Sequence, residues 1–120
     1  MLREGTGFKR VIIATGFTDL RCGIDGLASI IQNKFQLTPA EVGTLFLFCG
    51  RKSDRIKGLL FEGDGFLLLY KRLVPESKYQ WPRNEQEARE LTQEQFHDLM
   101  RGFNPLQKGL IWDVNPKRIG

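Results

Sequence analysis

Basic side chains that can bind phosphate are concentrated in one stretch of the chain. Cations attract the phosphate backbone of nucleic acids and displace its counterions, and binding of this kind carries little sequence information. Runs of basic residues also occur on solvated surfaces that have no ligand, so an ordinary hydrated hairpin edge is the alternative interpretation. The candidate nucleic-acid-binding residues are Arg51, Lys52, Arg55, Lys57, Lys71 and Arg72.

Residues suited to catalysis are sparse. The carboxylates that could form a two-metal nuclease site are Asp19, Asp25, Asp54, Glu62 and Asp64. Helix capping accounts for Asp19, an ion pair for Asp54 and a turn for Asp64. His97 is the only histidine and falls on an expected helix among polar residues, as a surface residue would. Because no nucleophile or metal cluster has a positioned base, we expect no enzyme activity, no metal and no cofactor.

The net charge of the chain is localised. With 120 residues, 41% of them hydrophobic and nine of them Phe, the chain can fold as one domain around a core of its own. Its net charge is +4, with a pI near 9.3. Residues 51–83 carry eight basic against four acidic side chains, whereas the segments on either side are nearly balanced. This distribution favours a polyanion such as DNA as the partner.

Nothing in the sequence predicts export or a membrane span. No apolar run approaches the roughly 20 residues needed to cross a bilayer, and the N-terminus lacks the apolar core of a secretory signal. Cys22 and Cys49 form no CxxC pair, so reduced, partly buried thiols are expected. We therefore expect a cytoplasmic protein with no membrane partner.

A long hairpin should position the basic residues. Its expected strands are Ile56–Glu62 and Phe66–Val74, and Asp64-Gly65 suits a type I′ turn because both central residues need positive φ. This register places Lys57 opposite Arg72. A two-stranded ribbon of this kind is narrow enough to enter a major groove or to lie along phosphates.

An amphipathic helix is predicted before the hairpin. Thr18 or Asp19 can cap its N-terminus, and Arg21 can pair with Asp25, four residues on. The expected helix spans Asp19–Phe35. Its apolar positions form one stripe: Ile24, Leu27, Ala28, Ile31 and Phe35.

The strands complete an α+β fold. Arg10–Ala14 reads as a short buried strand, and Leu45–Cys49, which is apolar on both faces, as a central one. Together with the hairpin they predict a small antiparallel sheet of about four strands, packed against one or two helices. Ala88–Leu91 fits either a helix or a strand.

The C-terminal part begins with a capping box at Thr92–Gln95, which opens a helix that Gly102 helps to end. The apolar positions of this helix are Phe96, Leu99, Met100 and Phe103. We expect one domain over residues 1–103 and a loosely ordered tail over 104–120. Most aromatic residues should lie in the core, with Tyr70 and Trp81 as the candidates for stacking on bases.

Several separated blocks resemble one known family. They are Gly16–Arg21, Asp25–Leu27, Leu45–Leu73 and Gln80–Pro82. Over residues 8–103 the chain resembles the TnpB accessory proteins of the insertion sequence 66 family. The resemblance implies a small bacterial protein, encoded in a mobile element beside a larger transposase, that assists transposition.

Two functions fit these observations. The first is an accessory protein for transposition that binds DNA without catalysis through the basic hairpin and assists the transposase. The alternative is a protein–protein adaptor that docks on the transposase without contacting DNA. An unpaired strand edge would also allow association with a second copy.

Overall fold

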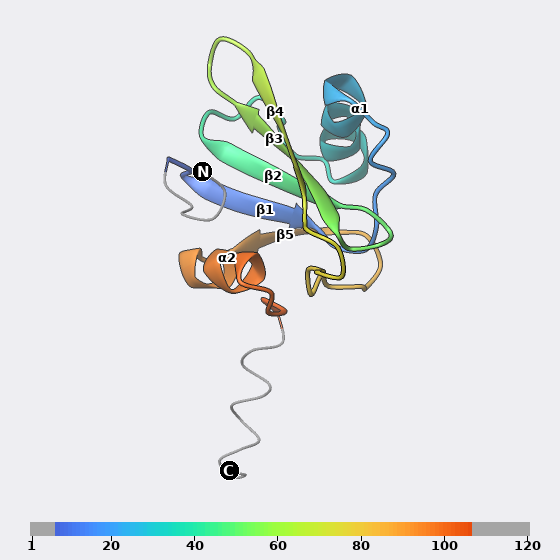
Figure 1. Cartoon of the computed structure of the whole chain (residues 1–120). Coiled ribbons are helices and arrows are strands. Elements are labelled where there is room, and N and C mark those ends of the chain that lie inside the picture. The colour runs from blue at the N-terminus through green and yellow to red at the C-terminus, as the bar shows by residue number, and fades with distance from the viewer. Residues whose placement is uncertain (1–6, 107–120) are drawn as a thin grey trace.

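The computed structural model describes residues 7–106, which form one five-stranded sheet with a helix on each face (Figure 1). The strand order across the sheet is β4-β3-β2-β1-β5. The elements in chain order are β1 (Arg10–Ala14), α1 (Ile24–Ser29), the π-helix η1 (Ile30–Lys34), β2 (Thr44–Cys49), β3 (Arg55–Phe61), β4 (Phe66–Arg72), β5 (Ala88–Leu91) and α2 (Gln93–Met100).

The sheet is mixed. β1 and β2 are parallel and are joined through α1 and η1, as a parallel pair requires a crossover. The pairs β2–β3, β3–β4 and β1–β5 are antiparallel. The α+β class is confirmed, with five strands instead of about four and with one parallel pair. The segment that fitted either a helix or a strand is strand β5.

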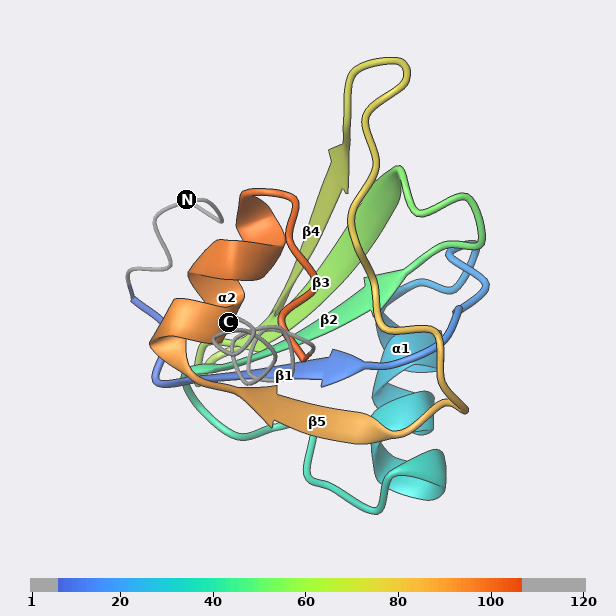
Figure 2. The same cartoon turned by 90° about the horizontal axis from the view of Figure 1, so that it is seen from below.

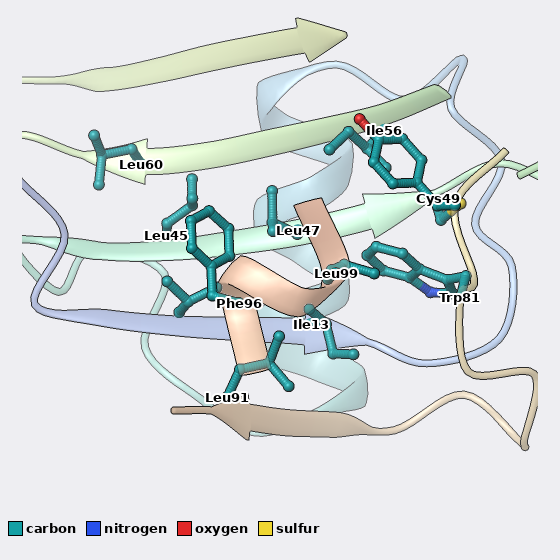
Figure 3. Packing of buried hydrophobic residues seen from close by; sticks show 12 residues of the cluster. Ile13, Leu45, Leu47, Cys49, Ile56, Leu60, Trp81, Leu91, Phe96 and Leu99 are labelled. Atoms are coloured by element: carbon teal, nitrogen blue, oxygen red, sulfur yellow. The ribbon is translucent and has the colours of Figure 1, made fainter. Parts of the chain in front are cut away.

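Each face of the sheet carries its own apolar cluster, because side chains alternate along a strand. On one face, Phe96 and Leu99 of α2 pack over Leu45, Leu47 and their neighbours (Figure 3). On the other face, Leu27 of α1 and Ile31 of η1 pack over residues such as Phe46. The expected central strand is confirmed, since every residue of β2 is buried.

The hairpin register differs from the prediction by two residues. Phe61 pairs with Phe66, and Glu62 N–H donates to the Gly65 carbonyl at 2.9 Å. The turn is therefore centred on Gly63-Asp64, with positive φ at Gly63 alone (99°), as in a type II′ turn instead of type I′. Both Gly63 and Gly65 could supply a turn glycine, and the pairing of β3 with its neighbours selects Gly63.

The first helix begins later than predicted. Gly23 is its N-cap, no side chain caps it, and the helix starts at Ile24. Asp19 instead accepts hydrogen bonds from the backbone N–H and the guanidinium of Arg21, so the expected Arg21–Asp25 pair is replaced by Arg21–Asp19. The apolar stripe is confirmed, since Leu27 and Ile31 are fully buried.

The connection from β4 to β5 crosses the ends of the central strands (Figure 2). Within it, Trp81 is only 3% exposed and its indole N–H donates to the Ala14 carbonyl at 2.9 Å. The expectation of an accessible Trp81 is therefore wrong, because its ring fills the core at the end of β1. Tyr70 is 54% exposed, as expected.

The second helix follows the sequence prediction closely. Both hydrogen bonds of the Thr92–Gln95 capping box are present. The helix ends before Gly102 (φ 95°), and Phe103, expected on the apolar face, is 60% exposed. Of the expected tail 104–120, residues 107–120 lie outside the described part of the chain, and Pro105 is buried. Within residues 7–106, no helix has the length and apolar character needed to cross a membrane.

Candidate nucleic-acid interface

The basic turn, residues 51–54 between β2 and β3, is anchored at both ends. Ser53 is buried, adopts a positive φ of 61°, and its N–H donates to the Gly50 carbonyl at 3.0 Å. Its own carbonyl accepts the Tyr79 N–H at 2.7 Å, and the Asp54 carbonyl accepts the Leu73 N–H at 2.8 Å. These bonds fix the turn against the connection from β4 to β5, and they leave Arg51 and Lys52 exposed.

The segment after β1 lies beside this turn. Gly16 has a φ of 72°, and a Cβ at this position would lie 2.9 Å from the Asn84 carbonyl oxygen, so only glycine fits here without strain. Thr18 N–H donates to the Cys49 carbonyl at 2.8 Å, and the Thr18 hydroxyl accepts from the Gln86 side chain at 2.8 Å. Residues 16–21 are thus held against the end of β2.

A cleft of about 950 Å³ lies between this segment, the basic turn and the β3–β4 ribbon. Apolar and aromatic side chains contribute to its walls, and cations come from both loops and from β3. The lining residues are Phe17, Thr18, Asp19, Leu20, Arg21, Gly50, Arg51, Lys52, Arg55, Lys57, Leu68 and Tyr70.

Two cations of the cleft are neutralised locally. The Arg21 guanidinium lies 2.7 Å from the Asp19 carboxylate and, through these hydrogen bonds, lowers the pKa of Asp19 to about 2. Arg55 pairs with Asp54 at 2.9 Å, and this hydrogen bond lowers the pKa of Asp54. Both carboxylates are therefore ionised at neutral pH and offset part of the positive charge.

Lys57, Arg51 and Arg83 contact uncharged partners. The Lys57 ammonium donates to the Cys22 carbonyl at 2.9 Å and lies 6.0 Å from the centroid of the Tyr70 ring. The guanidinium of Arg51 lies 5.9 Å from the centroid of Phe17, and that of Arg83 lies 5.7 Å from the same ring. Cation–π contacts of this kind orient a cation without neutralising it. Among residues 7–106, no carboxylate forms an ion pair with Arg51, Lys57 or Arg83.

The structure brings four of the six predicted residues together, namely Arg51, Lys52, Arg55 and Lys57. Arg72 pairs with Arg55 across the ribbon and shares its face, outside the cleft lining, whereas Lys71 pairs with Ile56 on the opposite face. The predicted opposition of Lys57 and Arg72 is replaced by Lys57–Tyr70, because the register is shifted.

Three features were not predicted from the sequence. They are the Phe17 ring and Arg21 in the cleft wall, and Arg83 beside Phe17. Phe17 and Arg21 belong to the Gly16–Arg21 block, so their occurrence in a compact motif was an available signal. Arg83 had no such signal, since it lies 66 positions after Phe17 along the chain.

Metal binding and thiol reactivity depend on the acidic, histidine and cysteine side chains of the described residues. Among residues 7–106, no group of three or more His, Cys, Asp or Glu side chains is placed to hold a metal ion. Both thiols are free, and burial raises the pKa of Cys49 to about 12, so that thiol is protonated and inert at neutral pH. The arrangement is suited to binding an anion.

Fold and cleft together define a small α+β protein with a cation-lined surface. Residues 9–109 match the family described as IS66 Orf2 like protein. The chain is 35% identical over 111 residues to the uncharacterized protein y4hO of Sinorhizobium fredii, covering 92% of this chain and 93% of that protein. It is also 27% identical over 95 residues to the uncharacterized protein y4jC of the same organism, covering 79% of this chain and 80% of that one. No solved structure matches.

The chain belongs to the IS66 Orf2-like family. This membership indicates an accessory role in the transposition of an insertion sequence.

Proposed function

We propose that this protein binds DNA without catalysis and thereby assists the transposase of its insertion sequence. The observation that carries the proposal is the cleft in which Arg51, Lys52, Arg55 and Lys57 converge with Arg21. Several of these cations have no carboxylate partner within residues 7–106, so a phosphate can engage them without displacing an existing ion pair.

The rigidity of the cleft supports the proposal. The backbone bonds at Ser53 and Asp54 hold the main chain that carries the cations, and the bond to the Cys22 carbonyl holds the Lys57 ammonium. Pre-organised cations lose less conformational entropy on binding than free surface side chains do.

Reversing the charge of Arg51, Lys52 and Arg55 together tests this function. If about four phosphates are neutralised, log affinity for duplex DNA should fall with log salt at a slope near −3.6. The triple variant should bind every DNA sequence more weakly and show a flatter slope. Its thermal unfolding should stay close to that of the parent, because Arg51 and Lys52 are exposed and Arg55 is only partly buried.

A matched variant separates the effect of charge in the cleft from the effect of overall net charge on DNA affinity. Lys9→Glu, Lys34→Glu and Arg89→Glu change the net charge by the same amount at exposed positions outside the cleft lining. This control should keep most of the parent's affinity. If the folded cleft variant binds DNA as the parent does, the cations form a solvated turn. The adaptor that docks on the transposase without contacting DNA then becomes the better account.

A further inference from the structure

The cleft contains an exposed aromatic ring beside its cations. Tyr70 is 54% exposed although it lies within strand β4, and Leu68 and Leu20 line the same hollow. Cations alone would suffice to bind the outside of a duplex through its phosphates. Apolar and aromatic surface inside a cationic cleft adds a second kind of contact, the stacking of an unpaired base.

The ends of the β3–β4 ribbon differ in charge, and this difference argues against insertion into a duplex groove. The turn at its free end carries Glu62 and Asp64, both exposed, which phosphates would repel. The cations Arg55 and Lys57 lie toward the other end, facing the segment 16–21 across the cleft. A protruding helix or ribbon reads a groove, whereas here the cationic surface is hollow.

Cations lie beside both aromatic rings that line the cleft, Phe17 and Tyr70. Lys57 lies 6.0 Å from the Tyr70 ring, while Arg51 and Arg83 both lie within 6 Å of the Phe17 ring. A single strand presents base faces and phosphates at the same time, and a duplex hides its base faces in the stack. A cleft of about 950 Å³ also lies in the range of pockets that enclose small ligands.

We propose that the cleft binds single-stranded DNA in preference to duplex DNA, and this inference rests on the proposed function. A base packs on the Tyr70 ring, and the flanking phosphates contact Lys57 and the cations of the basic turn. Arg51 and Arg83, held on Phe17, bind the phosphate backbone where it leaves the cleft.

Fluorescence anisotropy with a labelled 20-nucleotide strand free of self-complementarity, and with the duplex of the same sequence, tests this preference. The parent should bind the strand at least tenfold more tightly than the duplex. Tyr70→Ala should weaken binding of the strand by roughly five- to 150-fold, the range expected for the loss of one stacked base. Tyr70→Phe, which keeps the ring, should stay within about twofold of the parent.

Phe103→Ala is the matched control. Phe103 is 60% exposed and has a guanidinium, that of Arg101, 5.9 Å from its ring, so it reproduces an exposed aromatic beside a cation away from the cleft. This variant should bind the strand as the parent does.

Two results would overturn the inference: duplex binding as tight as strand binding, or a folded Tyr70→Ala variant with the parent's affinity for the strand. If duplex binding is then lost in the triple charge variant, the proposed function stands and the single-strand preference alone falls. If the parent binds neither DNA at low salt, both proposals fall.

Discussion

The two faces of the sheet are covered to different extents. On the α2 face, α2 and the connection that contains Tyr79 and Trp81 close the apolar cluster. On the α1 face, the short α1 and η1 cover β1, β2 and part of β3, and the basic end of the β3–β4 ribbon lines the cleft instead. One sheet therefore provides a sealed core on one side and a partly open surface on the other.

The residue types of the β3–β4 ribbon change where α1 and η1 no longer cover the sheet. On the α1 face, Leu59 of β3 is followed toward the basic turn by Lys57, and Leu68 of β4 is followed by Tyr70. The change from Leu to cation or exposed aromatic coincides with the edge of the cleft. On the α2 face β3 stays apolar at this level, since Ile56 is fully buried, whereas its partner on β4 is the partly exposed Lys71. The comparison indicates that residue types along β3 follow the cover of each face: near the basic turn they are apolar on the packed face and cationic on the open face.

The largest expected effect is on the sealed face. Phe96 is 1% exposed and packs at the centre of the α2 cluster, so Phe96→Ala should lower the free energy of unfolding by about 3–5 kcal/mol. Chemical denaturation measures this difference. Tyr70→Ala, an aromatic truncation at the open face, should cost about 1 kcal/mol or less, as expected for an exposed site. Equal losses in the two variants would contradict the proposed difference between the faces.

A medium effect is expected at Gly16, where backbone geometry supports the open face. Gly16→Ala forces an unfavourable positive φ and brings a Cβ to 2.9 Å from the Asn84 carbonyl oxygen, and it should cost about 2–3 kcal/mol. Gly102→Ala is the control, since Gly102 has a φ of 95° with no atom near the added Cβ, and it should cost about 1 kcal/mol. Thermal unfolding of the two variants compares these costs. A larger loss at Gly102 would show that close packing around residue 16 is unimportant.

The smallest effect concerns the Asp19–Arg21 pair at the rim of the cleft. The folded-state pKa of Asp19 is lowered to about 2 by its hydrogen bonds from Arg21, against an ordinary value of 3.8. The stability that this pair contributes is therefore present above pH 3.8 and is lost as the pH falls through about 2. Because the pair is exposed, salt screens it and its contribution is small.

Titration of the Asp19 carboxyl by NMR measures this shift directly. In Arg21→Ala the pKa of Asp19 should rise toward its ordinary value, while the structure of the basic turn stays unchanged. Arg21→Lys should keep part of the shift, since a lysine retains the charge but not the forked hydrogen bonds. A pKa of Asp19 that stayed near 2 in Arg21→Ala would assign the shift to another cause.

Local features of this protein could be predicted from the sequence alone. The capping box at Thr92 and Gln95, the stripe through Leu27 and Ile31, the buried strand β2 and the basic turn each depend on residues a few positions apart. The physical reason is that caps, helical faces and strand alternation are set by bonds and periodicities within one element. Confinement of the net positive charge to residues 51–83 was likewise visible without coordinates.

Other features were decided by tertiary structure. The pairing of β5 with β1, the choice of Gly63 over Gly65 in the turn and the burial of Trp81 against Ala14 all depend on which segments meet in space. The cleft forms in the same way, because Thr18 is bonded to the end of β2 and Lys57 to the Cys22 carbonyl, 35 residues away. Contacts between distant segments are selected by the packing of the whole chain. A local sequence pattern therefore does not reveal which of the possible contacts forms.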